Sequence, residues 1–324
     1  MKPGTIKRLV LVLLMLAGFT VIFRVVAGKS PKKLAFSHVT PQSTTKIEIN
    51  SVQAQVVLEK KNNIWMITSP IAFRANPDYI SELLNGIKKI SLKTVISTNP
   101  GKFEKFQVSD SSAAVVTVHT AGDKPPVSVM VGKQSTQNYS NLYVRLKGKP
   151  EVYDTEGPRL SFLKTSPEEW RDKTIISEKK AEVTEIDIIS RKETVKLFRK
   201  GKEWLLDDPE KGSPANEPEI NTILDTLEKL TATDIITPEQ QAQQKLKTGL
   251  DKPEFELLVK TTGSYQVRLT FGSVKANGKY YVKREGDDNL FQAYEYQVNN
   301  LRKEYSRLKK PETSPQAVPV TENK

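Results

Sequence analysis

The feature that most constrains this chain of 324 residues is an internal repeat with an offset of about 139 positions. Residues 45–49, Thr-Lys-Ile-Glu-Ile, return as residues 184–188, Thr-Glu-Ile-Asp-Ile, and Trp65 matches Trp204 at the same offset. After one inserted residue the match continues through two sets of apolar residues at helical spacing: Ile80, Leu83, Leu84, Ile87 and Ile90 against Ile220, Ile223, Leu224, Leu227 and Leu230. A shared order over this length indicates two tandem copies of one domain.

The local pattern within one copy predicts strands first and a helix after them. Apolar and polar residues alternate over 46–49, 56–60 and 64–67, which is typical of half-buried strands. A helix follows, with Asn76 in one copy and Asn216 in the other as N-caps. The same reading predicts later strands near 93–97, 114–119, 127–131, 141–146 and 152–154, then a short helix over 158–163.

Helices that are segregated from the strands favour an α+β class over a doubly wound parallel sheet. We therefore expect an N-terminal transmembrane helix followed by two tandem repeats. Each repeat is expected to be a mainly antiparallel sheet packed with one longer and one short helix. The predicted divisions are a cytoplasmic start and membrane anchor (1–28), a linker (29–44), repeat 1 (45–177), repeat 2 (178–310) and a disordered tail (311–324).

The membrane prediction rests on an apolar segment close to the N-terminus. Residues 9–23 carry no charge, and Arg24 is followed by Val-Val-Ala. A helix needs about 20 residues to cross a bilayer, so residues 9–27 suffice if Arg24 lies near the interface. We expect an uncleaved anchor that contacts the lipid bilayer through residues 9–27. A signal peptide cleaved after Val25-Val26-Ala27 is the alternative.

The net charge of +12 does not indicate a nucleic-acid partner, because of where it lies. Residues 1–33 contain seven basic residues and no acid, so more than half of the excess flanks the apolar segment. A duplex-binding domain is expected to carry its basic stripe on the folded part. The basic start favours a cytoplasmic N-terminus. We therefore expect a single-pass protein of the inner cell membrane with most of the chain in the periplasm.

Composition removes several kinds of chemistry. The chain has no cysteine and only two histidines, His38 and His119, which excludes disulfides, zinc-cysteine sites, iron-sulfur clusters and three-histidine metal sites. The tripeptide at 28–30, Gly-Lys-Ser, lacks the earlier glycine of a phosphate-binding loop, and adjacent acids such as Asp287-Asp288 are interpreted as solvated turns. We expect no catalytic, cofactor-binding or metal-binding residues and no enzymatic activity.

The three tryptophans are the residues most open to a functional interpretation. Trp65 and Trp204 occupy the same place in the two copies, where core packing is favoured over a ligand platform used twice. Trp170 begins the sequence Trp170-Arg171-Asp172-Lys173, just before the second copy. There a buried ring beside an Arg-Asp pair is favoured as a structural element over a partner contact.

These motifs together resemble a known family. A Trp followed by Pro and a helix, the turn Gly-Leu-Asp-Lys-Pro at 249–253, the Tyr-Val-Arg strand at 143–145 and the Trp-Arg-Asp-Lys sequence are similar to the bacterial family called domain of unknown function 4340 (DUF4340). Copy one departs from it with Gln-Val-Ser-Asp at 107–110, and copy two has Tyr-Ser-Arg at 305–307 in place of Trp-Arg-Asp-Lys. The resemblance implies a membrane-anchored envelope protein, found in some relatives alongside ABC-type export and gliding-motility components, with no established enzymatic activity.

The resulting hypothesis is a non-enzymatic binding or scaffold module, associated with a membrane-protein partner such as an ABC-type exporter. An envelope enzyme that acts on glycan or lipid through an unrecognised site is the alternative. A third hypothesis is a cytoplasm-facing protein that binds acidic partners through the +5 charge of residues 34–179.

Overall fold

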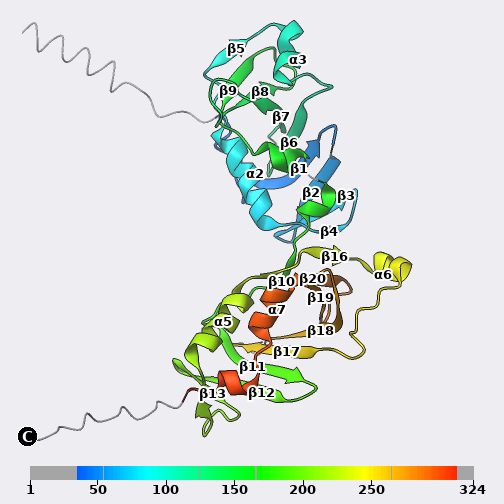
Figure 1. The fold of residues 1–324 in the computed structure, drawn as a ribbon. Helices are drawn as coiled ribbons and strands as arrows, with labels where there is room; N and C mark the ends of the chain where they lie inside the picture. Colours follow the sequence, from blue (N-terminus) through cyan, green and yellow to red (C-terminus); the bar gives the residue numbers. More distant parts are fainter. Residues whose placement is uncertain (1–34, 54, 123, 165, 264, 312–324) are drawn as a thin grey trace, which may run out of the picture. The chain divides into compact units, whose positions relative to one another are not determined.

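The computed structural model describes residues 35–311 except 54, 123, 165 and 264. These residues form two compact units that divide between Asp172 and Lys173 (Figure 1). Unit 1 contains the strands and helices that follow, in chain order: β1 (Thr44–Asn50), β2 (Gln55–Lys61), β3 (Ile64–Ser69), β4 (Phe73–Arg74), α2 (Pro77–Lys89), β5 (Val95–Ser97), the 3-10 turn η1 (Pro100–Lys102), α3 (Phe103–Phe106), β6 (Ala114–Thr120), β7 (Val127–Gln134), β8 (Leu142–Leu146), β9 (Val152–Thr155), α4 (Leu160–Lys164) and η2 (Pro167–Trp170).

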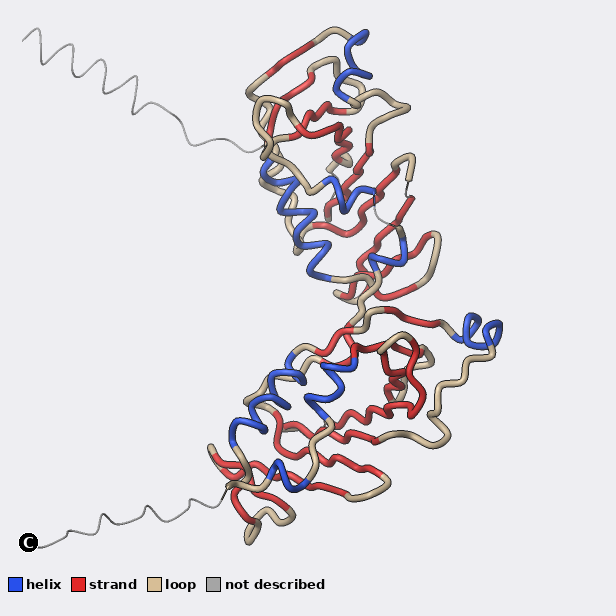
Figure 2. Tube along the Cα trace, in the orientation of Figure 1, coloured by secondary structure: helices blue, strands red, loops and turns tan. Residues whose placement is uncertain are grey.

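The strands of unit 1 form one antiparallel sheet of nine strands in the order β4-β3-β2-β1-β6-β7-β8-β9-β5. Strands β1 to β4 form one meander and β6 to β9 form a second, which joins the first through the β1·β6 pair. Helix α2 connects edge strand β4 to the opposite edge strand β5, so the chain crosses the sheet along the helix (Figure 2). This connection places the apolar side of α2 on one face of the sheet.

The sequence of α2 explains both its start and its packing. The Asn76 side chain accepts hydrogen bonds from the backbone N–H groups of Asp78 and Tyr79, and Pro77 occupies the first turn. Its apolar residues recur every three or four positions, so they share one face of the helix. That face is buried in the core of unit 1 together with Ile47 and Leu58 of the sheet.

Unit 2 repeats this plan. Its elements are β10 (Thr174–Ile176), β11 (Val183–Ser190), β12 (Thr194–Lys200), β13 (Glu203–Leu206), β14 (Ser213–Pro214), α5 (Glu217–Glu228), β15 (Leu230–Thr231), β16 (Asp234–Ile236), α6 (Pro238–Gln244), β17 (Phe255–Thr261), β18 (Gln266–Ala276), β19 (Lys279–Arg284), β20 (Leu290–Tyr294), α7 (Glu295–Leu301) and α8 (Tyr305–Leu308). The sheet order β14-β13-β12-β11-β17-β18-β19-β20-β16 matches that of unit 1 strand for strand.

Two segments lie differently from their sequence-based assignment. Phe36 and Val39, within the expected linker 29–44, are buried in the core of unit 1. Residues 173–177, placed at the end of repeat 1, belong to unit 2. There β10 pairs with β15 in a separate two-stranded sheet. In both places a few apolar side chains fill a gap in a core, and such short segments have no periodicity for a sequence pattern to detect.

The expected α+β class is wrong. Of the described residues, 41% are in strands and 21% in helices, so the fold is β-rich and mostly antiparallel sheet. The class was assigned as α+β because the short helical segments were counted as a helical layer packed on the sheet. Among the described α-helices, α3, α4, α6, α7 and α8 each have seven residues or fewer, and only α2 and α5 are longer.

The search for the expected transmembrane helix covers the described residues alone. Among the described residues no helix is long and apolar enough to cross a membrane. Residues 9–27, which carried that expectation, lie outside the described residues, as do residues 312–324 of the expected tail.

Candidate functional site

Trp65 and Trp204 lie at equivalent core positions, in β3 and β13, and each is 7% exposed. The carbonyl oxygen of each accepts a hydrogen bond of 2.8 Å, from the amide of Ala75 in unit 1 and of Ala215 in unit 2. The guanidinium of Arg199 lies 5.2 Å from the centre of the Trp204 ring. Neither ring presents an open face on which a ligand could stack, so this geometry favours packing.

Trp170 is fully buried at the end of η2. Its ring lies 6.1 Å from that of Tyr79 and 6.2 Å from that of Phe162, and its carbonyl oxygen accepts a hydrogen bond from the amide of Asn76. Its indole nitrogen has no hydrogen-bond partner among the described residues. The ring therefore holds the end of unit 1 against the start of α2.

Arg171 and Asp172 continue this segment along the edge of β4. Arg171 pairs with Ala75 in an isolated β-bridge, and its guanidinium lies 5.6 Å from the centre of the Phe73 ring. Asp172 forms an ion pair of 3.1 Å with Arg74, and the backbone amide of Asp172 donates a hydrogen bond to the carbonyl oxygen of Arg74. These contacts cover the edge strand of the sheet.

The counterpart of this segment in unit 2 begins three residues later than the sequence comparison suggests. Leu308 accepts the hydrogen bond from Asn216 at 2.7 Å, and Lys309 forms the bridge with Ala215. Leu308 thus takes the place of Trp170, and Tyr305-Ser306-Arg307 correspond to the turn before it.

The structure does not bring the five residues singled out from the sequence into one site. It places an open hollow of about 280 Å³ elsewhere in unit 1, at the turn between β1 and β2. Most of its lining side chains are hydroxyls, amides and small apolar groups: Ser51, Val52, Gln53, Gln107, Ser111, Ser112, Ala114, Val131 and Gly132. The lining can donate and accept hydrogen bonds without presenting a formal charge.

The wall of the hollow depends on a close approach between a loop and a strand. Gln107 has a φ of 56°, in the left-handed region. The carbonyl oxygen of Phe106 lies so close to Gly132 that a Cβ atom there would stand 2.2 Å from it. Unit 2 has the same arrangement, with Gly249 at a φ of 68° and the carbonyl of Thr248 over Gly272.

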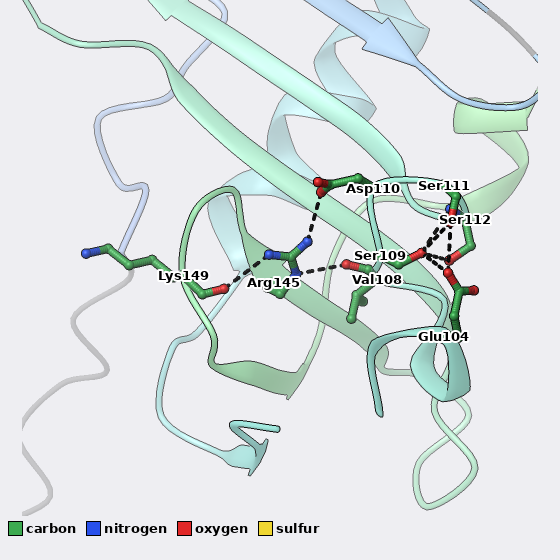
Figure 3. Close-up of polar contacts among 8 residues, drawn as sticks. All are labelled: Glu104, Val108, Ser109, Asp110, Ser111, Ser112, Arg145 and Lys149. Carbon is green, nitrogen blue, oxygen red and sulfur yellow. Dashed lines mark hydrogen bonds and ion pairs between the residues drawn. The ribbon is translucent and has the colours of Figure 1, made fainter. Parts of the chain in front are cut away.

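Serine hydroxyls organise the loop that follows Gln107 (Figure 3). The hydroxyls of Ser109 and Ser111 donate hydrogen bonds to the carboxylate of Glu104, the second at 2.8 Å. Ser109 also lies 2.7 Å from the hydroxyl of Ser112. The bond from Ser109, and after it the one from Ser111, holds the pKa of Glu104 below its usual value.

Arg145 of β8 holds the first residues of this loop in place. It is 6% exposed, and its guanidinium donates to the carbonyl of Val108 at 2.8 Å and to the carboxylate of Asp110 at 3.1 Å (Figure 3). A third bond of 3.2 Å reaches the carbonyl of Lys149. The ring of Phe103 lies under the guanidinium at 4.3 Å. The position of the loop is therefore set by a buried, fully engaged cation.

The two units differ at the turn between their first two strands. The turn 190–193 is equivalent to residues 51–54 and carries Arg191 in the place of Val52. The Arg191 side chain donates a hydrogen bond of 2.5 Å to the carbonyl of Lys252, in the loop equivalent to 107–112. Val52 is 82% exposed and too short to make such a bridge. The two copies therefore differ in access to the same place in the fold.

Unit 2 has a larger hollow of about 580 Å³, which is lined by the turn 190–193 and by residues that follow α7. Three of its basic side chains form ion pairs. Arg302 pairs with Glu254, and both Lys303 and Arg307 bind Glu219, at 2.8 and 2.7 Å. The two bonds to Glu219 tie α5 to the segment after α7, and the Arg302–Glu254 pair ties that segment to the start of β17, which is a structural role.

Within the part of the chain that the structure describes, no three His, Cys, Asp or Glu side chains converge as metal ligands would. The polar residues of the unit 1 hollow were not identified from the sequence. The available signal was the departure of Gln-Val-Ser-Asp at 107–110 from the Gly-Leu-Asp-Lys-Pro turn of copy two. That difference shows that the loop is altered in copy one. The turn at 51–53 lines the same hollow as this loop through a tertiary contact, which a sequence pattern does not reveal.

Comparison with known proteins agrees with the duplication. A family model described as Domain of unknown function (DUF4340) matches residues 65–248 and matches again over residues 204–313. The family resemblance seen in the sequence is thereby confirmed. No curated protein and no solved structure was found to match the chain.

Proposed function

We propose, from the premise that the chain belongs to the DUF4340 family, that it is a non-enzymatic binding or scaffold module of the bacterial envelope. In this proposal it acts beside a membrane complex such as an ABC-type exporter. The hollow of unit 1 receives a polar, uncharged part of the partner, such as a peptide loop. Both units have the same sheet order, and they differ in the side chain at the turn between the first two strands.

The observation that supports a binding role is the difference between Val52 and Arg191. In unit 2 the arginine occupies the gap between the turn and the loop and satisfies a backbone carbonyl. In unit 1 the same gap is left open and is lined by the side chains of Ser51, Gln53 and Gln107. The side-chain amides of Gln53 and Gln107 can donate and accept hydrogen bonds at this open surface, so the lining suits recognition of a polar backbone.

The proposal places the protein at the inner membrane, with residues 9–27 in contact with lipid and the two units outside the cytoplasm. The uncharged run 9–23 and the basic residues before it support this placement. A reporter that is active only in the periplasm, fused after Lys324, is expected to give signal. A dark fusion that is stably produced would contradict the placement and favour a cytoplasm-facing protein.

The partner is tested by photo-crosslinking in cells. A photoreactive amino acid replaces Gln53 at the rim of the hollow in the full chain, and the adducts are identified by mass spectrometry. The variant Val52→Arg introduces the side chain that closes unit 2 and is expected to remove most of the adduct. Ile64→Arg adds the same charge at the exposed first position of β3, which pairs with the far end of β2, and is expected to leave the adduct unchanged.

Equal adduct yields from the wild-type chain and from Val52→Arg would show that the hollow is not the binding site. A yield that falls equally in both arginine variants would point to a general charge effect. Either result would remove the support for a binding role at this place.

A further inference from the structure

One end of unit 1 carries four exposed lysines on two segments that are distant in the sequence. We call this set the lysine end; it consists of Lys102, Lys105, Lys147 and Lys149. Lys102 and Lys105 belong to η1 and α3, and the other two lie in the turn between β8 and β9. None of the four ammonium groups forms an ion pair with another described residue.

Arg145 holds the two segments of the lysine end together. Its guanidinium stacks on Phe103, which lies between Lys102 and Lys105 in the chain, and it donates a hydrogen bond to the carbonyl of Lys149. In Figure 3 the Lys149 side chain extends away from this guanidinium. The buried arginine thus fixes the backbone on both sides while the lysine side chains stay free.

Two of the three carboxylates close to these lysines in the sequence accept hydrogen bonds from other side chains. Glu104 accepts hydrogen bonds from Ser109 and Ser111, and Asp110 is bound by Arg145. Glu151 is the remaining acid of the turn. Counted with Arg145, the four lysines face the three carboxylates of Glu104, Asp110 and Glu151, so these residues together keep a net charge of +2, and neither Lys102 nor Lys105 forms an ion pair with a described carboxylate.

The second copy has the opposite charge at the same turn. Gly148 and Gly286 are equivalent, both with a φ of 79°, but the flanking residues in unit 2 are Glu285, Asp287 and Asp288. Counted from the first proline of each helical segment, the places of Lys102 and Lys105 are taken by Gln240 and Gln243. A basic end is therefore a property of unit 1 and not a requirement of the fold.

We propose that the lysine end of unit 1 docks on a membrane surface that carries anionic lipid headgroups. Four flexible ammonium groups without a pocket between them suit a diffuse negative surface better than a single bidentate ligand. Phe36 is buried in unit 1, so only residues 28–35 separate this unit from the segment 9–27. This inference rests on the proposed function, which places that segment in contact with lipid, and such a short link raises the effective concentration of lipid at unit 1.

The electrostatic attraction has a defined size and range. Each lysine within the surface potential of an anionic leaflet contributes roughly a fivefold gain in binding. The attraction falls off within a Debye length, about 8 Å at physiological ionic strength and about 3 Å at 1 M. The lysine end should therefore lie close to anionic headgroups at low salt and leave them at high salt.

The test uses the full chain in lipid nanodiscs, one set of pure phosphatidylcholine and one set enriched in phosphatidylglycerol. Since the natural sequence has no cysteine, Pro150→Cys gives a single labelling site at the lysine end, and Asp288→Cys gives the equivalent site in unit 2. A nitroxide is attached at each site. Its relaxation rate is measured in discs that contain a paramagnetic lipid headgroup, and the rate rises as the label comes closer to that headgroup. Residues 9–27 meet the same acyl chains in both discs, so a difference between discs reports on charge.

We expect the relaxation rate at position 150 to be about threefold or more higher in phosphatidylglycerol discs than in phosphatidylcholine discs, and this difference to vanish at about 1 M salt. The rate at position 288 should not differ between the discs. The pair Lys147→Glu and Lys149→Glu should abolish the difference. The pair Lys192→Glu and Lys202→Glu makes the same charge change at exposed positions of unit 2 and should preserve it.

Equal rates at position 150 in the two kinds of disc would overturn the proposal. It would also be overturned if a duplex oligonucleotide at physiological salt displaced the label from phosphatidylglycerol discs, because the occupant would then be a nucleic acid. No partner protein is present in this experiment, so its failure leaves the crosslinking result at Gln53 unaffected. The crosslinking test can equally fail without changing the result in nanodiscs.

Discussion

The backbone amide of Asn76 donates a hydrogen bond of 2.8 Å to the carbonyl oxygen of Trp170. The side chain of the same asparagine caps α2, so the start of the covering helix and the final segment of the unit are tied through one residue. Unit 2 repeats the bond between Asn216 and Leu308. This joint closes the edge of each sheet. Its two versions differ in the residue that accepts the bond and in the asparagine side chain, because that of Asn216 does not cap α5 as expected but donates to the carbonyl of Arg307.

Replacing Trp170 by the residue found in unit 2 tests the importance of its ring. Trp170→Leu leaves a cavity beside Tyr79 and Phe162, partly offset by the removal of an indole N–H that has no partner among the described residues. We expect the free energy of opening of unit 1 to fall by about 2 to 4 kcal/mol. Hydrogen exchange of the slowest amides of β1 and β6 measures this quantity for unit 1 alone. Tyr139→Leu, at a position 78% exposed, should change it by less than about 0.5 kcal/mol.

The loop residue with a positive φ is Gln107 in unit 1 and Gly249 in unit 2, and both positions can be substituted to compare the two loops. Gln107→Gly relieves a positive φ but adds flexibility to the unfolded chain, so we expect unit 1 to gain no more than about 1 kcal/mol. Gly249→Ala should instead destabilise unit 2 by more than about 1 kcal/mol, because its Cβ would stand 2.4 Å from the hydroxyl of Ser273. Urea midpoints of the two variants measure both effects. Changes of the same sign would show that the two turns are not equivalent.

Arg145 should be far more important for stability than its ion pair with Asp110. Arg145→Met keeps much of the volume but leaves the carbonyl of Val108 without its buried donor. We expect a loss of about 3 kcal/mol in unit 1 and faster exchange of the amides of residues 108–112. Asp110→Asn removes only a carboxylate that is 87% exposed, and it should cost less than about 1 kcal/mol. A larger loss from Asp110→Asn than from Arg145→Met would reverse this assignment.

Glu219 should make the stability of unit 2 dependent on acidity. The hydrogen bond from Lys303, together with the nearby charge of Arg307, holds the pKa of Glu219 below its ordinary value of 4.5. A carboxyl group whose pKa is lower in the folded state stabilises the fold above its unfolded value, and this contribution is lost as the pH falls through its folded value.

We therefore expect Glu219→Gln to destabilise unit 2 at pH 7, and the difference from the wild type to shrink below pH 4.5. Thermal unfolding across this range measures the difference. Glu217→Gln, at an exposed position of the first turn of α5, is the matched control and should show a much smaller difference. A pH-independent loss in Glu219→Gln would mean that its role is steric.

Much of the local structure could be predicted from the sequence. Alternation over 46–49 and 56–60 corresponds to β1 and β2, and the helical spacing from Ile80 to Ile87 corresponds to α2. The overall class could not, because the same short apolar stretches serve in helical turns and in strands. Their role depends on the pairing of β1 with β6 and of β5 with β9, between residues far apart in the chain.

The candidate site shows the same division. The sequence pointed to Trp65, Trp204 and Trp170, since large aromatic residues at repeated positions are visible in a pattern, but all three are buried. The hollow is formed by side chains with no pattern of their own. Their proximity depends on the left-handed turn at Gln107, the close approach at Gly132 and the buried hydrogen bonds of Arg145.

The order and spacing of residues along the chain are enough to predict the duplication, the alternation that forms the strands and the longer helix of each copy. Three other properties are visible in the folded chain alone: the fold is β-rich, Arg191 bridges to the loop of unit 2 where unit 1 has Val52, and four lysines meet at one end of unit 1. Those properties depend on contacts across the sheet, where a single change of side-chain length or charge decides whether a gap is filled.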